Sequence, residues 1–378
     1  MPRINALAER HNPTYNNVMK IKLYKPRLRL LLLGLLITTL PWGQSIAETS
    51  NNNAVVFMYH HFGVKQHPTT NVSLDQFDAH LDHLQQQGYS VWPLQDIVSH
   101  LKQGKVLPDR TVAITVDDAY ISVYTEAWPR LRQRSWPLTV FVSSAGVDRK
   151  QPAYMSWEQM REMQQQGASF ANHSSNHDYL IRRQSGEDRQ AWLQRVRADI
   201  QHNQQRLQQE LGNVPLLFAY PYGEYNLALK ALLKELGYTA FTQQSGAINN
   251  HSDPQLLPRF PMAAHFADID SFRTKAATLA LPVISAKPEE PVTEQHQPSI
   301  TITLNNEETS DIQLKQLSCF ISGQGQTAVQ WLDKIRFTLT AARPLPEGRN
   351  RYNCTAPSKQ KSGRYYWFSR LWIVQGEY

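Results

Sequence analysis

Short apolar runs alternate with segments of helical periodicity from residue 54 to about residue 281, and this alternation restricts the fold more than any other feature. Strands are expected at the apolar runs, and helices where apolar residues recur every three or four positions. A repeated β-then-α order over more than 200 residues predicts an α/β protein with parallel strands and outer helices, as a barrel or an open sheet. The expected strands are 54–59, 111–116, 138–143, 168–172, 216–220 and 238–242, and helices are expected to begin near 74, 121, 156, 187 and 226. Ser156 and Gln159 predict a capping box at the third of these helix starts.

The pattern changes after residue 281. Residues 282–298 contain four prolines and scattered acidic residues, which predicts a Pro-rich linker. In residues 299–378 apolar and polar residues alternate without clear helices, which predicts a small all-β C-terminal domain. The two cysteines of the chain, Cys319 and Cys354, both lie there. We expect one disulfide between them in an exported protein, and two free thiols in a cytosolic one.

The N-terminal segment carries most of the net charge of +7, a charge that would otherwise suggest nucleic acid as a partner. Residues 1–47 hold seven basic residues and one acidic residue, so the rest of the chain is nearly neutral and no nucleic acid is expected. The segment also has an eleven-residue, mostly apolar run at 30–40 and a small-residue site ending at Ala47. It predicts a signal peptide cleaved after Ala47, with Met19 as an alternative start, and a periplasmic or extracellular protein. The alternative is an uncleaved anchor, although the run is shorter than the ~20 residues that span a bilayer.

Two aspartates and two histidines follow predicted strands and form the strongest chemical signal. Asp117 and Asp118 end one apolar strand, and His173 and His177 follow a later one. The carboxyl ends of parallel strands open onto the ligand side of an α/β fold, so these side chains are expected to converge. Two histidines four residues apart share one face of a helical turn, and one of the carboxylates would complete a three-ligand metal site with open positions. The other carboxylate would accept a proton from water.

Each pair also has a simpler interpretation when it is taken alone. An Asp-Asp pair is commonly a turn or a helix cap, and two histidines at this spacing are commonly a surface helix face. A third element, Pro221 to Gly223, follows the strand at 216–220. It predicts a tight loop whose backbone N–H groups face a ligand, or an ordinary β-to-α turn.

In this combination and order, the motifs resemble those of the polysaccharide deacetylases of carbohydrate esterase family 4. The resemblance covers roughly residues 55–272. It rests on four ordered motifs, which are Tyr59-His60-His61, Thr115-Val116-Asp117-Asp118, His173 to His177, and Pro221-Tyr222-Gly223.

This resemblance implies both a fold and an activity. The fold is an irregular (β/α)-barrel at residues 48–281, and the activity is removal of acetyl groups from N-acetylated sugars in a polymer. It implies Asp117 as general base and the backbone N–H of Tyr222 at the oxyanion. It implies one divalent metal, usually Zn²⁺, with three ligands, which are Asp118, His173 and His177.

The chain departs from the family pattern at two places. Many members carry, shortly before the Pro-Tyr-Gly turn, an arginine that pairs with the base, whereas Ala219 stands there. We expect Arg259 to replace it from a neighbouring strand; the alternative is a surface ion pair. His265 lies in the region of the family's general acid and is assigned that role. With Tyr59-His60-His61, these departures resemble the poly-N-acetylglucosamine deacetylase branch more than the chitin or peptidoglycan branch.

Other functions receive less support. The chain has no Gly-x-Ser-x-Gly elbow, and its histidine pair lacks the glutamate of a zinc-protease helix. A non-enzymatic alternative is a catalytically weak or inactive carbohydrate-binding protein on a deacetylase scaffold, which Ala219 and the unclear acid motif suggest. The expected partner is an N-acetylated polysaccharide, either an exopolysaccharide or a cell-wall glycan. The sequence leaves open the oligomeric state, and whether the C-terminal domain binds substrate, a partner or the cell envelope.

Overall fold

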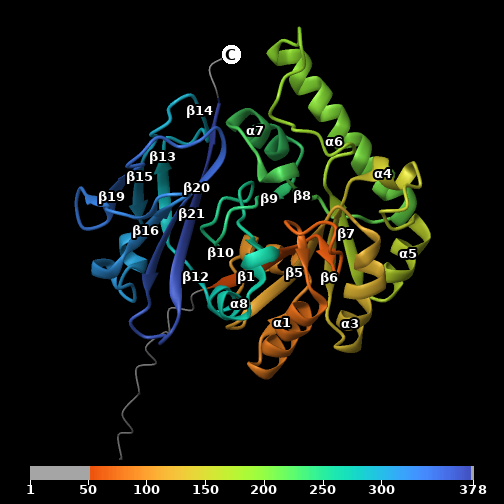
Figure 1. Ribbon diagram of the computed structural model, residues 1–378, viewed down its shortest axis with the longest axis horizontal. Coiled ribbons are helices and arrows are strands. Elements are labelled where there is room, and N and C mark those ends of the chain that lie inside the picture. The colour runs from red at the N-terminus through yellow and green to blue at the C-terminus, as the bar shows by residue number, and fades with distance from the viewer. Residues whose placement is uncertain (1–51, 376–378) are drawn as a thin grey trace, which may run out of the picture. The chain divides into compact units, whose positions relative to one another are not determined.

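A mostly parallel sheet of buried apolar strands forms the centre of residues 53–261, as seen in a computed structural model that describes residues 52–375 (Figure 1). In the described residues this sheet has nine strands in the order β10-β1-β5-β6-β7-β8-β9, with β11 and β4 paired to β1 and β5. Neighbours from β1 to β9 are parallel, and β10 is antiparallel to β1. The strands are β1 (Asn53–Tyr59), β4 (Ser90–Val91), β5 (Thr111–Asp117), β6 (Leu138–Val142), β7 (Ala168–Asn172), β8 (Leu217–Ala219), β9 (Thr239–Phe241), β10 (Ala247–Asn249) and β11 (Phe260–Pro261).

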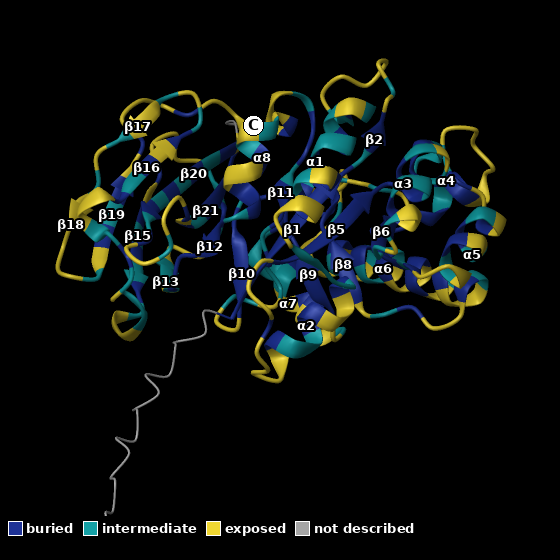
Figure 2. Cartoon of the chain, turned by 90° about the horizontal axis from the view of Figure 1, so that it is seen from below, coloured by how far each residue is buried: buried dark blue, intermediate teal, exposed yellow. Residues whose placement is uncertain are grey.

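Helices follow most of these strands and lie outside the sheet (Figure 1). Their inner faces are apolar and their outer faces exposed, whereas the central strands are buried throughout (Figure 2). The capping box expected at Ser156 is present and starts the α5 helix, and Ser73 starts α1 in the same way. The helices are α1 (Leu74–Gln86), α2 (Leu94–Lys102), α3 (Trp128–Gln133), α4 (Ser144–Asp148), α5 (Trp157–Gln165), α6 (Arg189–Leu211), α7 (Leu227–Glu235) and α8 (Ile269–Ala276).

One short segment, residues 257–261, runs between the two ends of this curled sheet. Leu257 forms a parallel bridge with Phe241 of β9, and β11 then pairs with β1. The curled sheet with outer helices fits the barrel-like α/β fold that the sequence predicts. The bridging segment also places Arg259 between the first and last parallel strands of the sheet.

Residues 279–374 form two further sheets around a shared apolar core. One sheet contains β12 (Leu279–Ala280), β14 (Val292–Thr293), β16 (Ser318–Ile321), β17 (Gly325–Thr327), β20 (Gly348–Pro357) and β21 (Tyr365–Val374). The other contains β13 (Val283–Lys287), β15 (Ser299–Leu304), β18 (Gln330–Trp331) and β19 (Arg336–Thr340). Cys319 and Cys354 are directly paired on β16 and β20 and form a disulfide, as predicted.

The prediction of a linker at residues 282–298 is wrong. In the structure β13 pairs with β15, and β14 pairs with β21. The prolines lie at the ends of these strands rather than inside them, because Pro282 precedes β13, Pro288 and Pro291 separate β13 from β14, and Pro298 precedes β15. The prolines therefore mark the ends of strands here and do not indicate a flexible linker.

The predicted signal peptide at residues 1–47 lies outside the described residues. Within residues 52–375, no helix is both long enough and apolar enough to cross a membrane.

Candidate active site

The two aspartates lie where β5 ends, and the backbone turns sharply between them. Asp117 is the last residue of β5, whereas Asp118 and Ala119 have positive φ values of 75° and 57°. Non-glycine residues in this left-handed region carry a steric cost and cluster at functional sites. The turn sends the two adjacent carboxylates to different partners, which are Arg259 for Asp117 and two histidines for Asp118.

Arg259 holds the Asp117 carboxylate with a bidentate ion pair. Its two terminal nitrogens donate to Oδ1 and Oδ2 at 2.7 and 2.8 Å, and its Nε donates to the Thr242 carbonyl at 3.1 Å. Both side chains of the pair are fully buried. Burial by itself raises the pKa of Asp117, but Arg259 and His173 outweigh it and hold this pKa below its ordinary value. Asp117 is therefore an ionised carboxylate in a fixed orientation.

Asp118, His173 and His177 form a cluster with the composition of a metal site. Asp118 Oδ1 lies 3.4 Å from His173 Nε2 and 3.3 Å from His177 Nε2, and the three possible ligand atoms lie within 4.8 Å of one another. Burial raises the pKa of Asp118, but the three neighbouring histidines, His173 above all, more than compensate and lower it. One carboxylate oxygen and two imidazole nitrogens suit a divalent transition metal such as zinc.

The hydrogen bonding of His173 supports this interpretation. Its Nδ1–H donates to the Ala219 carbonyl at 2.7 Å, so Nε2 carries the lone pair. Nε2 is buried and makes no hydrogen bond with any described residue. An acceptor nitrogen without a hydrogen-bond partner, facing a carboxylate in the interior, has the character of a metal ligand, since buried polar atoms are otherwise satisfied.

The two histidines converge through a loop and not through the helical turn that their spacing predicted. Residues 173–177 form no helix, and both Ser174 and His177 have positive φ values, of 61° and 59°. The loop is held by side chains, because the Asn172 amide oxygen accepts from the Ser174 N–H and the Ser174 hydroxyl accepts from the His177 N–H. The sequence therefore predicted correctly that the two histidines converge, but the helical conformation on which that prediction relied is absent from residues 173–177.

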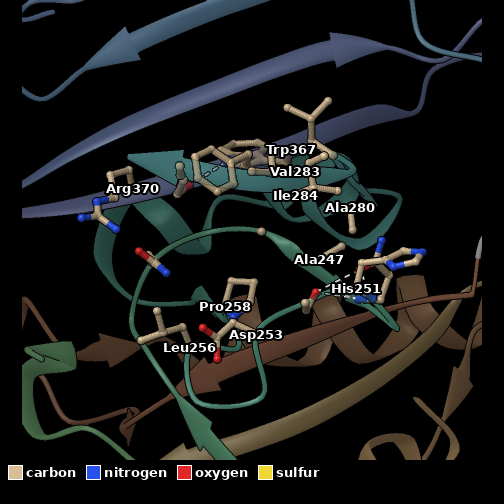
Figure 3. A pocket seen from close by; sticks show the side chains of 18 of the residues that line it. Ala247, His251, Asp253, Leu256, Pro258, Ala280, Val283, Ile284, Trp367 and Arg370 are labelled. Carbon is tan, nitrogen blue, oxygen red and sulfur yellow. Dashed lines mark hydrogen bonds between the residues drawn. The ribbon is translucent and has the colours of Figure 1, made fainter. Parts of the chain in front are cut away.

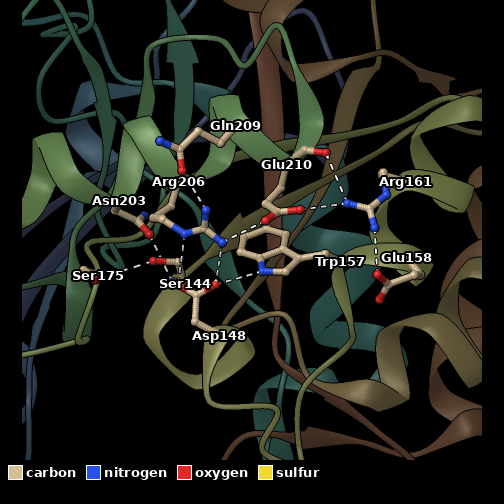
Figure 4. A network of polar contacts seen from close by, with 10 residues as sticks. All are labelled: Ser144, Asp148, Trp157, Glu158, Arg161, Ser175, Asn203, Arg206, Gln209 and Glu210. Carbon is tan, nitrogen blue, oxygen red and sulfur yellow. Dashed lines mark hydrogen bonds and ion pairs between the residues drawn. The ribbon is translucent and has the colours of Figure 1, made fainter.

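Helix α6 fixes the strand ends that carry this loop. The Asn203 amide donates to Asn172 Oδ1 and to the Val142 carbonyl, and its oxygen accepts from the Ser144 N–H. One turn further along α6, Arg206 binds Asp148 and Glu210, and Asp148 also accepts from the Trp157 indole (Figure 4). These contacts connect α4, α5 and α6 around the β6 and β7 strand ends.

Tyr222 lies beside the cluster in a single 3-10 turn, Pro221–Gly223. Tyr222 has φ 59°, and a Cβ on Gly223 would come within 2.8 Å of the Gln243 backbone nitrogen, so glycine is required there. The Tyr222 ring packs edge-on against His177, with centroids 4.6 Å apart, and stacks on Tyr179 at 3.9 Å. The turn is therefore adjacent to a candidate metal ligand.

His265 and His60 differ in their relation to the site. His265 is exposed in a 3-10 turn, Ala264–Ala267, and its ring contacts Phe266. Its role as general acid stays a prediction. His60 follows β1, the neighbour of β5, and its Nε2 lies 4.0 Å from Asp117 Oδ2. His60 belongs to one of the four sequence motifs but was assigned no role, and its position directly after an apolar strand was the available signal.

A well-formed cavity lies elsewhere. A cavity of about 470 Å³ separates the 244–258 segment from β12, β13 and β21, and Pro258 and Ala247 face Val283 and Trp367 across it (Figure 3). It contains none of the residues Asp117, Asp118, His173 or His177.

A curled parallel sheet with an Asp-His-His cluster and a buried carboxylate at its strand ends defines an α/β protein suited to hold one divalent cation. The comparisons with known proteins agree, because residues 104–241 match the family model described as polysaccharide deacetylase. The chain therefore carries a polysaccharide deacetylase domain and is an N-deacetylase enzyme.

Two relatives are similar to this chain over longer stretches than this region. A putative polysaccharide deacetylase of Bacillus subtilis, YxkH, is 26% identical over 207 residues, covering 54% of this chain and 69% of that protein. The poly-β-1,6-N-acetyl-D-glucosamine N-deacetylase of Escherichia coli K12 is 26% identical over 215 residues, covering 48% of this chain and 32% of that protein.

Solved structures show the same fold. The Streptococcus pyogenes deacetylase PplD has a TM-score of 0.54 at 22% identity, covering 59% of this chain and 98% of that chain. IcaB from Ammonifex degensii has a TM-score of 0.52 at 27% identity, covering 60% of this chain and 96% of that chain.

Proposed function

We propose that this protein is an exported, metal-dependent deacetylase that removes N-acetyl groups from an amino-sugar polysaccharide, with poly-β-1,6-N-acetylglucosamine as the first substrate to test. The observation that carries the proposal is the pairing of two units at one edge of the sheet. These are the Arg259-bound Asp117 carboxylate and the Asp118, His173 and His177 cluster beside it. The substrate follows from the relatives named for that polymer.

The chemistry adds water to the acetamide carbonyl and breaks the C–N bond, giving acetate and a free amine. Asp117 accepts a proton from the attacking water as the new C–O bond forms. Arg259 keeps both oxygens of that carboxylate oriented, which limits the positions from which the water can be deprotonated. The Tyr222 N–H donates to the oxygen that gains negative charge.

The leaving amine needs a proton, and His60 is the better placed donor. Its Nε2 is 4.0 Å from Asp117 Oδ2, whereas His265 is exposed on a separate turn. Protonated His60 delivers its proton to the nitrogen as the C–N bond breaks. Asp118, His173 and His177 would hold the divalent cation, zinc on our proposal, which polarises the carbonyl and lowers the pKa of water when bound.

Export is part of the proposal because polymers of this kind lie outside the cytoplasm. The N-terminal sequence and the Cys319–Cys354 disulfide both support it, since disulfides persist in oxidising compartments. On this view the C-terminal sheets form an accessory β domain that stays with the enzyme at the cell envelope or in the medium.

The test is acetate release from β-1,6-linked N-acetylglucosamine oligomers by the purified, zinc-loaded protein. Asp117→Asn keeps the shape of the side chain but removes its basicity, so we expect acetate release to fall by at least roughly 1,000-fold. Asp75→Asn, at an exposed position on α1, is the matched control and should behave like wild type. Unchanged release by Asp117→Asn would refute the assignment of the base.

The alternative of an inactive carbohydrate binder loses one of its two arguments. It rested on the absence of an arginine before the Pro-Tyr-Gly turn and on the unclear acid motif, and Arg259 supplies an arginine partner for Asp117. Metal analysis of the isolated protein separates the two functions, because a binder on a decayed site has no need of a stoichiometric divalent cation.

A further inference from the structure

An arginine of the C-terminal sheets reaches the turn that carries Tyr222. Arg349 is the second residue of β20, and its Nη1 donates to the Tyr222 carbonyl at 2.7 Å. The guanidinium carbon also lies over the Tyr222 ring, 5.9 Å from its centroid. A residue 127 positions away in sequence therefore contacts both the backbone and the side chain of this turn.

Arg349 also lies close to a buried carboxylate, that of Glu224. Glu224, which directly follows the turn, is 5% exposed, and its Oε1 lies 3.6 Å from Arg349 Nε. Its second oxygen is buried and makes no hydrogen bond within residues 52–375. Burial raises the pKa of Glu224, and Arg349 opposes that shift. Arg349 is thus the cation closest to a carboxylate that would otherwise be poorly compensated.

The strand that carries Arg349 is held in place by its neighbour β21. Arg349 pairs with Ile373 of β21, and Ile373 and Leu371 pack in one apolar cluster with Tyr220 and Tyr225. Tyr220 and Tyr225 flank the turn on either side in sequence. The strand that carries Arg349 is therefore anchored to the turn that Arg349 contacts.

A loop also contacts the turn. Tyr179 stacks on Tyr222 with rings 3.9 Å apart, and the Arg182 guanidinium lies 3.8 Å from the Tyr179 ring centroid. The Tyr222 ring is thus contacted by Tyr179 on this loop and by Arg349 on β20. Of the contacts that Arg349 and Tyr179 make with Tyr222, only the Arg349 contact is a hydrogen bond to the Tyr222 backbone.

We infer that Arg349 is a positioning residue for the deacetylase site: by binding the Tyr222 carbonyl and Glu224, it holds the Pro221–Gly223 turn so that the Tyr222 N–H faces the substrate carbonyl. The inference rests on the proposed function, because it assigns the Tyr222 N–H to the oxyanion. It makes the C-terminal sheets a component of the active site rather than a separate binding module. Turnover, and not substrate affinity, depends on Arg349.

The experiment compares three variants of the full protein with wild type. Arg349→Gln removes the charge and the fork of donors, whereas Arg349→Lys keeps one charged donor. Arg343→Gln is the matched control, because Arg343 is an exposed arginine between β19 and β20 that donates to a backbone carbonyl, that of Gly323. Amide hydrogen exchange of residues 220–225 and steady-state kinetics of acetate release are measured for each.

We expect amide exchange at residues 220–225 to become roughly tenfold or more faster in Arg349→Gln. We expect kcat to fall roughly 10- to 100-fold with KM within about twofold, less than the loss of about 100- to 1,000-fold for removing an oxyanion donor outright. Arg349→Lys should recover kcat to within about threefold of wild type, and Arg343→Gln should match wild type.

Wild-type exchange at residues 220–225 in Arg349→Gln overturns the inference, whatever the activity. An equal loss of kcat in Arg343→Gln also overturns it, since the effect would then be a general loss of stability. If wild type releases no acetate, the proposed function fails separately, and the exchange measurement still decides whether Arg349 holds the turn.

Discussion

Arg259 shows how one residue on a bridging segment completes a buried ion pair at the candidate site. It lies between Leu257, which bridges to β9, and β11, which pairs with β1, so its side chain enters the interior where the sheet ends approach each other. There it binds Asp117, the Thr115 hydroxyl and the Thr242 carbonyl. Its planar fork matches a carboxylate with two parallel hydrogen bonds, which a lysine ammonium cannot do.

Arg259→Lys is therefore expected to slow turnover more than it weakens substrate binding. The buried charge is kept, so the fold tolerates the change better than loss of the cation, but Asp117 is no longer held at both oxygens. We expect kcat for acetate release to fall roughly 10- to 100-fold, with KM within about twofold. Arg273→Lys is the control, because Arg273 is an exposed arginine in an i,i+3 pair on α8. A wild-type kcat in Arg259→Lys would contradict an orienting role.

Residue type and position after a strand were enough to predict most of the site. Asp118, His173 and His177 converge as expected because each follows a parallel strand that ends at the same edge. The Arg259 partner was expected for Asp117 only by analogy with the family, since nothing local in the sequence specifies a contact across 142 residues. His60 was not assigned because its approach to Asp117 depends on β1 lying next to β5.

At the scale of elements, His80 connects α1 to β1 and to the turn before α8. It is fully buried, its Nε2–H donates to the Ala267 carbonyl, and its Nδ1 accepts from the Tyr59 hydroxyl. Its ring also stacks on Phe272 with centroids 4.0 Å apart. Both ring nitrogens are used by the neutral form, so protonation would disrupt the Tyr59 contact. Burial is the main reason that the pKa of His80 falls from 6.5 to about 4.

This pKa predicts an acid-sensitive contribution to stability. Because the folded-state pKa lies below the unfolded value, the unfolded chain binds the proton more readily, and stability is lost as pH falls from 6.5 towards 4. His80→Gln should be less stable than wild type at pH 7, but should lose about 2 kcal/mol less unfolding free energy between pH 7 and 4.5. Denaturant unfolding at both pH values measures this difference.

The control for that experiment is His202→Gln, which changes an exposed histidine on α6. It should lose as much stability on acidification as wild type does. An equal loss in His80→Gln would show that the acid sensitivity arises elsewhere, for example at buried carboxylates.

Elements with strong local signals were predictable, and elements that depend on distant partners were not. The capping box at Ser156 and the buried strands such as β5 and β6 were found, because caps and apolar runs are local properties. Strands β13 and β14 were missed because prolines surround them and because their partners, β15 and β21, lie up to 81 residues further along the chain. The loop at residues 173–177, which carries His173 and His177, was expected to be helical. Hydrogen bonds to the side chains of Asn172 and Ser174 replace the helical backbone pattern there.

At the scale of the whole molecule, the C-terminal sheets are joined to the deacetylase domain through side-chain contacts and a shared apolar cluster. β12, which follows α8, pairs with β21, and Trp367 of β21 packs against Phe260. Arg364 binds Asp109 with two hydrogen bonds and the Ala277 carbonyl with a third. The described residues 52–375 accordingly belong to one compact unit, for which the sequence predicted a domain, a linker and a second domain.

Because the described residues form one compact unit, we expect a change that destabilises the C-terminal sheets to lower the thermal stability of the active site as well. The Cys319–Cys354 disulfide closes a loop of 35 residues, so Cys319→Ala/Cys354→Ala should cost about 3–4 kcal/mol of unfolding free energy. We expect calorimetry to show one transition with a Tm roughly 5–10 °C lower, and acetate release to be lost over the same temperature range. Ser318→Ala/Thr355→Ala changes the adjacent pair on the same two strands without removing a covalent bond, and should shift Tm much less. Two transitions, with acetate release surviving the first, would show instead that the C-terminal sheets unfold independently of the deacetylase domain.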